Sequence, residues 1–327
     1  MPSPRLEKAT FFVKRALVDI VRPYRFGVSK NYKPTERPTD SHMPYVLAYS
    51  TEGMVKRYGL KFDEEGIAMT KHYIHQGEGH YYSPVKIAHF GLACLNDALS
   101  GAGNESYEAY RSHLHWLIEN YADVNGEVIW RVPSTSPKYD LGFNYVSAIS
   151  QGLALSLLAR SEPGPTRSRA AELSDAALIP MTRPVADGGL LGESKWGPCY
   201  EEYPCIPFSH VVNGFVFCLN GLYDAYAAFR SDKAKALFDA GLETLENMTR
   251  EWFIAGWARY DLRDLYTGGV PNLATRHYQY LHADQMMGLG LITREPKWFE
   301  LSRKFERQAL NPIGLAYAYW SKARKWL

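Results

Sequence analysis

The stretch "NYVSAISQGLALSLLARS", residues 144–161, is apolar on nearly every side if it is wound into a helix. A helix without a polar face belongs in the interior of a protein. Gly152 lies near its middle, and Gly91 and Gly214 hold the same place in two similar stretches, at a spacing of about 60 residues. Glycine costs a helix about 1 kcal/mol relative to alanine. Three glycines at one repeat position therefore predict that helices approach one another closely there.

Each apolar stretch is followed by an amphipathic one, which predicts a buried inner helix and a solvent-facing outer helix. The predicted pairs are 83–101 with 104–121, 144–161 with 166–179, 209–229 with 232–253, and 276–292 with 296–310, and a last helix covers 311–327. Ser83 and Ser209 are the predicted N-caps of the first and third inner helices. Four such hairpins predict a mainly α chain arranged as an α/α barrel, or toroid. A plain solenoid is the alternative, although it would need polar capping repeats.

The first 82 residues have a different pattern and predict an N-terminal extension to a barrel domain at 83–327. Phe12, Leu17 and Ile20 share one side of an amphipathic N-terminal helix, and 41–82 predicts two short strands with a turn near Asp63–Gly66. The extension needs a surface to pack on, so we expect a homodimer. Charges interrupt the N-terminus every few residues, which argues against a signal peptide or a membrane span and favours a cytoplasmic location.

Composition narrows the range of functions. A net charge of +2 gives no bias toward nucleic acid. Twenty-three tyrosines suit a polar groove lined with flat apolar faces, such as a sugar-binding cleft, although half-buried helix filler is an equal alternative. Cys94 and Cys218 lie in apolar helical runs and are predicted to be buried thiols, and the four cysteines have neither zinc-ligand nor disulfide-framework spacing. We expect no metal and no cofactor.

The segments before the inner helices concentrate aromatic and charged residues. They include "GHYYSP" before the first, "DLGFNY" before the second, "CYEEYPCIP" before the third and "ARYDLRDLYTGGVPNLATRHY" before the fourth. The inner helices of an α/α barrel run parallel, so these segments are expected at one mouth. Helix N-termini attract anions there, and Arg263 and Arg276 add full charges. The alternative is that these loop residues only satisfy one another.

Glu202 and Tyr203 are the predicted proton-transfer groups of this mouth. A proton beside a carboxylate can be removed when the carboxylate is neutralised, the carbanion is stabilised and a base lies within hydrogen-bond reach. Glutamate and tyrosine titrate far from neutral pH as free side chains. Burial would raise the pKa of the glutamate, and a nearby arginine would lower that of the tyrosine.

Five motifs carry a family resemblance. "YEEYP" (200–204), "VVNGF" (211–215), "LNGLYD" (219–224), "YDLR" (260–263) and "PNLA" (271–274) resemble the catalytic domain of D-glucuronyl C5-epimerases. These enzymes convert glucuronate to iduronate in heparosan and heparan sulfate precursors. The resemblance is specific over 196–292, looser over 72–160, and implies an α/α barrel.

The resemblance implies roles for individual residues. Glu202 and Tyr278 would be the acid/base pair on either side of C5, with Tyr203 and Tyr260 orienting the ring. Arg263 would hold the uronate carboxylate, and Asn213 would contact the substrate. Further expected substrate contacts at the mouth are Tyr82, His89, Tyr145, Tyr200, Asn272, Arg276, His277, Tyr280 and His282.

Three departures from the family leave the substrate open. The family has glutamines where this chain has Lys86 and His89, and an arginine where it has Thr275. The β-rich domain that the animal enzymes insert after the first inner helix has no counterpart here. The preferred prediction is an epimerase that acts on an anionic uronic-acid polysaccharide. A uronate polysaccharide lyase, a hydrolase of uronic-acid oligosaccharides and a non-catalytic uronan-binding protein are the alternatives.

Overall fold

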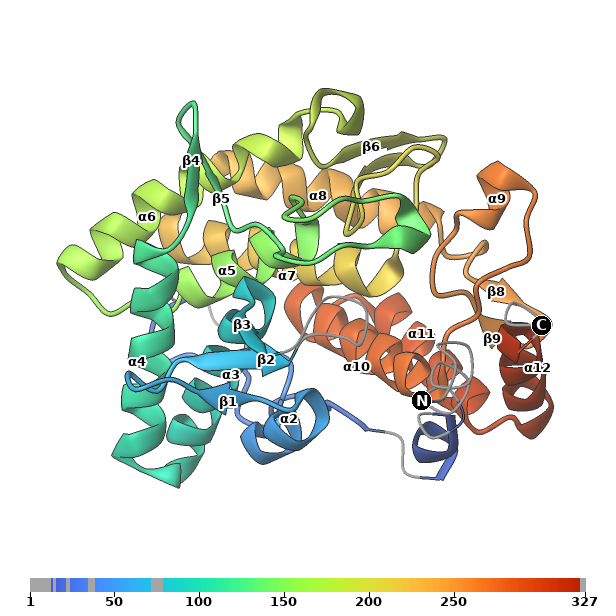
Figure 1. Ribbon diagram of the computed structural model, residues 1–327, viewed down its shortest axis with the longest axis horizontal. Helices are drawn as coiled ribbons and strands as arrows, with labels where there is room; N and C mark the ends of the chain where they lie inside the picture. The colour runs from blue at the N-terminus through green and yellow to red at the C-terminus, as the bar shows by residue number, and fades with distance from the viewer. Residues whose placement is uncertain (1–12, 14–15, 22–23, 35–38, 72–78, 324–327) are drawn as a thin grey trace. The chain divides into compact units, whose positions relative to one another are not determined.

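The computed structural model describes residues 13, 16–21, 24–34, 39–71 and 79–323. It is mainly helical, as predicted (Figure 1). Its contacts form two compact units, one made of residues 28–248 and the other of residues 1–27 together with 249–327. The predicted domain boundary after residue 82 falls inside the first unit and stays a prediction.

The unit 28–248 contains three helical hairpins and short strands. Its helices are α2 (Thr51–Tyr58), α3 (Pro84–Asp97), α4 (Asn104–Glu119), α5 (Ala148–Leu158), α6 (Pro165–Ala177), α7 (Val212–Phe229) and α8 (Asp232–Asn247), with shorter turns η1 (Ala98–Ala102), η2 (Pro137–Tyr139), η3 (Ile179–Thr182) and η4 (Val185–Asp187). The first three predicted inner–outer pairs are therefore confirmed as α3–α4, α5–α6 and α7–α8.

The strands of this unit are all antiparallel. They are β1 (Lys61–Phe62), β2 (Ala68–Lys71) and β3 (His80–Tyr82) in one sheet, β4 (Ala122–Val124) with β5 (Glu127–Ile129), and β6 (Leu191–Ser194) with β7 (Gly197–Tyr200). Lys61 pairs with Met69 and Phe62 with Ala68, so the hairpin predicted around Asp63–Gly66 is confirmed.

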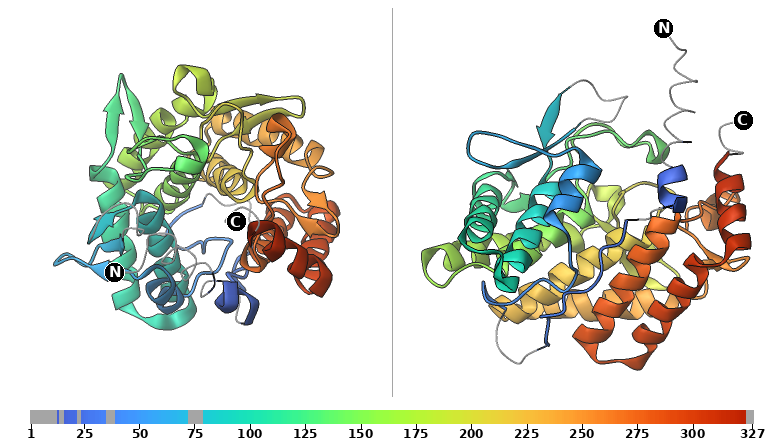
Figure 2. Two further views of the ribbon diagram at one scale, coloured as in Figure 1. Left: turned by 45° about the vertical axis from the view of Figure 1, so that its right-hand side comes forward. Right: turned by 90° about the horizontal axis from the view of Figure 1, so that it is seen from below.

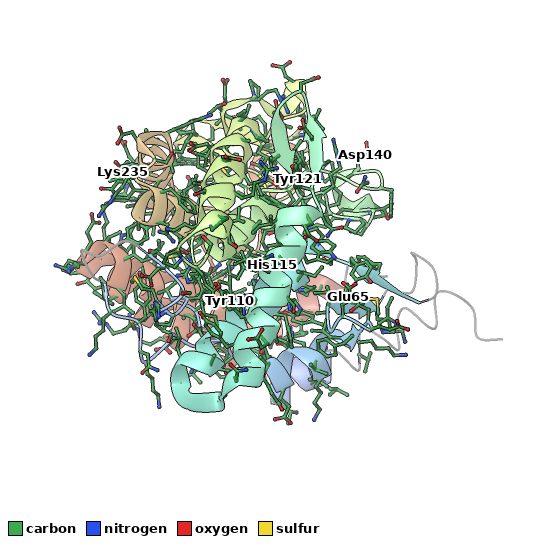
Figure 3. All side chains as sticks on the ribbon, turned by 90° about the vertical axis from the view of Figure 1, so that its left-hand side faces the viewer. Glu65, Tyr110, His115, Tyr121, Asp140 and Lys235 are labelled. Atoms are coloured by element: carbon green, nitrogen blue, oxygen red, sulfur yellow. The ribbon has the colours of Figure 1, made fainter. Side chains whose placement is uncertain are left out.

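The inner helices are buried nearly all round, and the outer helices have one wet face. In α5, ten of the eleven positions are buried, which accounts for its lack of a polar side. In the outer helix α4, Tyr110 is buried and its hydroxyl donates to Arg160 O, whereas His115 is exposed (Figure 3). Burial of the apolar stripe of each outer helix against its inner partner stabilises the hairpin.

Close helix approach is confirmed at Gly91 and Gly152, whereas a Cβ at Gly214 would meet the side chain of Glu202, which lies in a loop. A Cβ added at Gly152 of α5 would lie 2.5 Å from Cys218 Cα of α7, and one added at Gly91 of α3 would lie 2.9 Å from a Leu157 methyl of α5. A Cβ added at Gly221 of α7 would in turn collide with the Gly152 carbonyl. The absent side chains therefore allow α7 to pack directly on the backbone of α5.

The second unit consists of a helical hairpin, a C-terminal helix and short segments. Its elements are β8 (Phe253–Ile254), β9 (Trp257–Ala258), α9 (Asp264–Thr267), α10 (Arg276–Thr293), α11 (Pro296–Ala309) and α12 (Pro312–Ala323). The antiparallel pair α10–α11 is the fourth predicted hairpin (Figure 2). Residues 16–21 are helical, and most of the predicted N-terminal helix lies outside the described residues. Closure of the four hairpins into a ring stays a prediction.

One predicted helix cap is wrong. The third inner helix begins at Val212 with Val211 as N-cap, and Ser209 lies outside it. The Ser209 hydroxyl donates instead to Glu201 Oε2 at 2.6 Å. A buried carboxylate eight residues upstream offers a charge-assisted hydrogen bond, which is stronger than a bond within the helix turn. Ser83 does hold the N-cap position of α3, without a side-chain hydrogen bond.

The predicted buried thiols are confirmed, since Cys94 and Cys218 are both buried and reduced. No helix within the described part of the chain combines the length and the apolarity needed to cross a bilayer.

Candidate active site

The loop that follows strand β7 is held against the start of α5. The backbone N–H of Ala148 donates to Glu201 O at 3.0 Å, and the Ser147 hydroxyl donates to Glu202 O at 2.6 Å. These bonds leave the side chains of Glu201 and Glu202 pointing into the unit, where both are buried. The loop therefore presents two adjacent carboxylates in surroundings with little water.

Glu202 is the more unusual of the two carboxylates. Its side chain is 7% exposed, Asn213 Nδ2 donates to its Oε2 at 3.1 Å, and a Cβ at Gly214 would collide with it. Burial raises the pKa of Glu202 to about 7, although hydrogen bonds from Tyr203 and Asn213 and the charge of Lys86 act in the opposite direction. A carboxyl group with this pKa can accept or give up a proton near neutral pH.

Glu201 has a structural network of its own. Its carboxylate accepts hydrogen bonds from the Ser209 hydroxyl and the His210 backbone N–H, and His210 Nδ1 lies 2.5 Å from Oε1. Donor atoms of Cys199, Glu201 and His210 lie within 4.8 Å of one another, a spacing that a metal ion could bridge. Protein donors already contact both carboxylate oxygens, which accounts for the buried charge without an ion.

Tyr203 lies in a cluster of aromatic rings. Its ring stacks on Tyr139 at 4.2 Å between centroids, with 17° between the planes, and Tyr145 lies 6.1 Å away. Lys138 Nζ donates to the Tyr139 hydroxyl at 2.8 Å. Tyr139 and Lys138 were missed by sequence reasoning because they lie in the turn η2, well before the second inner helix. The sequence "PKY" in that turn matches no motif that would indicate a functional residue.

Three other predicted contacts in this unit have protein partners. The Tyr82 hydroxyl donates to Asp63 Oδ2 at 2.6 Å, and Tyr200 is 1% exposed and donates to Leu237 O at 2.8 Å. His89 is also buried, with Nε2 3.2 Å from the Tyr49 hydroxyl. Burial, with the charge of Lys86, holds the pKa of His89 well below its usual value, so this imidazole is neutral.

In the other unit, Tyr260 and Tyr278 form a pair. Their ring centroids lie 4.7 Å apart at 69°, an edge-to-face arrangement. The Tyr260 backbone N–H donates to Asn272 O at 2.7 Å, and Asn272 Nδ2 donates to Asp261 Oδ2 at 2.6 Å. Arg263 follows in the same loop and, like both tyrosines and Asn272, is half-buried. The predicted tyrosines and the predicted carboxylate clamp therefore come from one hydrogen-bonded segment and the first turn of α10.

Arg276 and His277 are engaged by the N-terminal segment. Their backbone N–H groups donate to the two carboxylate oxygens of Asp19, each at 2.8 Å. The Arg276 guanidinium donates to the Ile20 and Ala309 carbonyls, and His277 Nδ1 lies 2.7 Å from Tyr24 O. The side chains predicted to contact the substrate are thus engaged by the backbone of Ile20, Tyr24 and Ala309.

The remaining predicted residues on α10 are buried. Tyr280 is 7% exposed and lies beneath the Arg25 guanidinium, 4.4 Å from the ring centroid. His282 packs against Tyr278 and Phe305, and neither of its ring nitrogens has a hydrogen-bond partner among the described residues. Burial lowers the pKa of His282 to about 3, so its ring is neutral at physiological pH.

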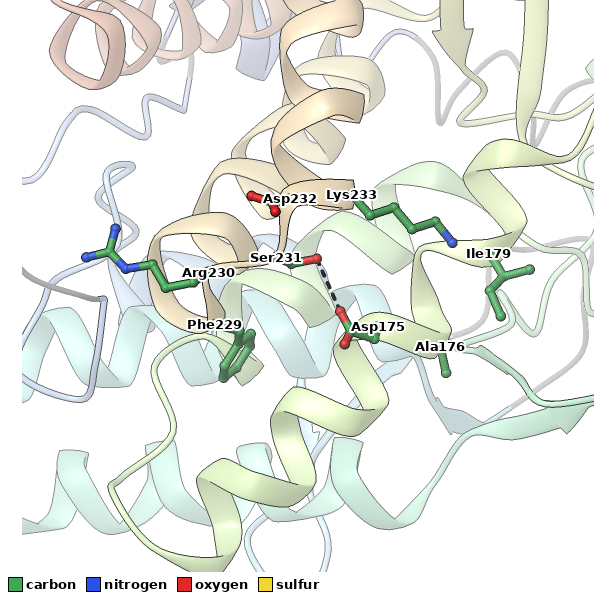
Figure 4. A pocket seen from close by; sticks show the side chains of 8 residues that line it. All are labelled: Asp175, Ala176, Ile179, Phe229, Arg230, Ser231, Asp232 and Lys233. Carbon is green, nitrogen blue, oxygen red and sulfur yellow. Dashed lines mark hydrogen bonds between the residues drawn. The ribbon is translucent and has the colours of Figure 1, made fainter.

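A surface pocket of about 570 Å³ lies elsewhere on the unit 28–248 (Figure 4). Asp175, Arg230, Ser231 and Lys233 line it, and the Ser231 hydroxyl donates to Asp175 at 3.2 Å. Arg230 follows the last residue of α7, whereas Asn213 is at the beginning of that 18-residue helix. The pocket is therefore separated from Glu202 by roughly the 27 Å length of an 18-residue helix.

Comparison with known proteins identifies a family that matches this chain. Residues 125–307, more than half of the chain, match the family model described as D-glucuronyl C5-epimerase C-terminus. The matched region includes Glu202, Tyr203, Tyr260 and Tyr278.

The chain is also 28% identical over 256 residues to the D-glucuronyl C5-epimerase of Caenorhabditis elegans. The aligned region covers 73% of this chain and 40% of the nematode protein, so the chain spans less than half of that relative's length. The extent of the family match shows that the chain belongs to the D-glucuronyl C5-epimerase family.

Proposed function

We propose that this chain inverts C5 of D-glucuronate to give L-iduronate within a heparosan-type polysaccharide. The observation that carries the proposal is the environment of Glu202, a buried carboxyl group with a pKa of about 7. Such a group can exchange a proton with a weak carbon acid near neutral pH. Membership of the family and the name of the nematode relative support the same chemistry.

Glu202 has the support that a proton-transfer group needs. Asn213 and Tyr203 hydrogen-bond its carboxylate, and the loop backbone is fixed to α5 through Ser147 and Ala148. These contacts hold the oxygen atoms in place while the proton moves, so little reorganisation accompanies the transfer. Stacking of Tyr203 on Tyr139 limits the movement of the ring whose hydroxyl bonds Glu202.

Inversion needs a second proton-transfer group for the opposite face of the sugar ring. We assign this role to Tyr278, with Tyr260 beside it in edge-to-face contact. One group removes the C5 proton, the electron pair spreads onto the carboxylate oxygens, and the other group returns a proton to the other face. Each turnover then leaves the two groups in exchanged protonation states, which solvent resets.

The substrate carboxylate must be neutralised for C5 to become acidic. We assign this role to Arg263, because a guanidinium can bind both oxygens of a carboxylate at once. Arg276 is a poorer candidate, since its guanidinium donates to the carbonyls of Ile20 and Ala309.

The test is incubation of the protein with N-acetylated and N-sulfated heparosan in D₂O, followed by NMR of the uronate residues. We expect deuterium at C5 together with iduronate signals. A new double-bond absorbance with shortened chains would identify a lyase instead, because β-elimination shares the first step. Absence of both label and product with every uronan tested would contradict any proton-abstraction chemistry and leave binding as the function.

A further inference from the structure

Lys86, which stands where the family has a glutamine, lies in the first turn of α3. Its Nζ is 3.6 Å from the centroid of the Tyr58 ring, which fixes the position of the ammonium group, and the side chain is half-buried. Within the described part of the chain, no carboxylate lies within ion-pair distance of this Nζ. The ammonium group therefore rests on an aromatic face and is not neutralised by a carboxylate of the described residues, so it can pair with an anionic ligand.

Contacts between α3 and α7 place Lys86 on the side of Glu202. The His89 ring packs edge-on against Phe217 of α7, at 5.0 Å between centroids. Lys86 lies one turn before His89 in α3, and Asn213, the partner of Glu202, lies one turn before Phe217 in α7. The charge of Lys86 lowers the pKa values of both Glu202 and His89, as expected of a cation close to each.

A second, independent feature of this place is His89 Nδ1. The imidazole is 3% exposed, its Nε2 is close to the Tyr49 hydroxyl, and Nδ1 has no hydrogen-bond partner among the described residues. Buried polar atoms of this kind are usually satisfied by water or by a ligand. A neutral imidazole that carries its proton on Nδ1 would donate to an oxyanion without adding charge.

We propose that Lys86 and His89 form an anion subsite beside Glu202 that binds a second negatively charged group of the polysaccharide. The ligand chemistry is an oxyanion on a residue next to the reacting uronate, either the carboxylate of a neighbouring uronate or a sulfate on the glucosamine. The identity of this ligand rests on the proposed function, because the function names the polysaccharide that supplies it. With this subsite, the affinity of the protein for the polysaccharide depends on the charge of the sugar residues next to the reacting uronate.

The experiment measures chain binding in an inert background. In Glu202→Gln the neighbouring group is a neutral amide, so an effect of Lys86 cannot pass through the charge of Glu202, and the chain is not turned over. Calorimetric titration compares this background with the same protein carrying Lys86→Gln, Lys86→Arg or the control Lys56→Gln. Lys56 is exposed on α2, the helix that carries Tyr58.

We expect Lys86→Gln to weaken binding of the anionic chain about tenfold, the effect of one lost charged hydrogen bond. Lys86→Arg should bind close to the background, and Lys56→Gln should match it. Carboxyl-reduced, unsulfated chain should bind equally to all four proteins. Equal weakening with N-acetylated and N-sulfated heparosan identifies a uronate carboxylate as the ligand, and weakening with the N-sulfated chain alone identifies the sulfate.

Equal affinities for Lys86→Gln and its background would overturn the subsite, and so would an equal loss with the neutral chain or failure of any chain to bind. The outcome is separate from the test of the proposed function. C5 exchange by the parent with no effect of Lys86 on binding removes the subsite alone. Lys86-dependent binding without exchange removes the epimerase and keeps the subsite.

Discussion

The proposed proton-transfer role of Glu202 can be tested by replacing this one residue. Replacement by glutamine keeps the size of the side chain and its bond to Asn213 but removes the carboxyl group proposed to transfer the proton. We expect Glu202→Gln to lower the rate of C5 exchange by about 100-fold or more, the usual contribution of a general acid or base. Chain affinity should change little. Near-normal exchange by this variant would exclude Glu202 from proton transfer.

The raised pKa of Glu202 also predicts how stability depends on pH. In the unfolded chain this carboxyl ionises near pH 4.5, and in the folded protein near pH 7. Its protonated form is therefore favoured by folding, and that contribution is complete below pH 4.5 and is lost as pH rises through 7. The loss is of the order of 3 kcal/mol for a shift of this size.

Glutamine at position 202 cannot ionise, so Glu202→Gln should be more stable than the parent above pH 7 and equal to it below about pH 4.5. Chemical unfolding at pH 5, 7 and 8.5 measures the difference. A difference that is constant with pH would mean that the carboxyl titrates near its ordinary value in the folded protein.

The sequence pointed to the proposed reacting residues more readily than to the residues that hold them in place. Glu202 and Tyr203 belong to a five-residue motif, so their types and spacing could be read directly. Tyr139, which stacks on Tyr203, is 64 positions earlier in a turn of no regular pattern. Its contribution depends on the packing of the chain in three dimensions, which periodicity does not encode.

In helix α7, Gly214 packs directly against the side chain of Glu202. Alanine normally stabilises a helix relative to glycine by about 1 kcal/mol. At Gly214 the added methyl group would run into the carboxylate of Glu202. We expect Gly214→Ala to abolish most C5 exchange by displacing Glu202, although alanine raises the helix propensity of α7.

Gly142→Ala is the control, because a Cβ at Gly142 has open space, and it should leave the rate of exchange unchanged. Exchange by Gly214→Ala at the rate of the parent would contradict the tight fit between Gly214 and Glu202.

Helix α10 takes its N-terminal cap from a distant part of the chain. Thr275 occupies the N-cap position without a side-chain bond, and Asp19 supplies the carboxylate for the Arg276 and His277 N–H groups. We expect Asp19→Ala to lower the free energy of unfolding by about 1–2 kcal/mol, as the loss of a charged cap does. Asp175→Ala, which removes the exposed bond of Figure 4, should change it by less than about 0.5 kcal/mol.

The helices could be predicted from the sequence, whereas the capping of α10 by Asp19 could not. A hydrophobic period of 3.6 residues is a local property, and it located the inner and outer helices to within a few residues at most of their ends. Asp19 and His277 are separated by 258 positions, so their contact is fixed only when the whole unit folds. Equal stability of Asp19→Ala and the parent would show that the cap is replaced by water.

At the scale of the whole molecule, the division into two units could not be read from the sequence. The chain leaves the unit of residues 1–27 and returns to it at residue 249, after 28–248 have formed the other unit. The pattern of apolar helices is continuous across that return, so it suggested one domain from residue 83 onward. The contacts of Asp19 and Arg25 with α10 and α11 reveal the discontinuous unit.

We propose the exposed face of the C-terminal helix α12 as the interface of the expected homodimer. Ile313 and Trp320 of α12 are 79% and 54% exposed and, at i and i+7, lie on one face of the helix; Tyr317 between them stacks on Trp320 but is half-buried against the Trp257 cluster. Exposed apolar patches of this kind commonly mark contacts between proteins. We expect light scattering after size exclusion to give twice the chain mass of 37.1 kDa.

Charge on this face of α12 should break the dimer, because an ionised carboxylate is costly to bury between apolar surfaces. Ile313→Glu and Trp320→Glu should each elute as monomers with unfolding temperatures close to the parent's, since both side chains are exposed in the single chain. Arg303→Glu, a charge reversal at an exposed position of α11, should remain dimeric. A parent protein that is monomeric at every concentration would contradict the homodimer, and a dimer that survives both glutamates would place its interface away from α12.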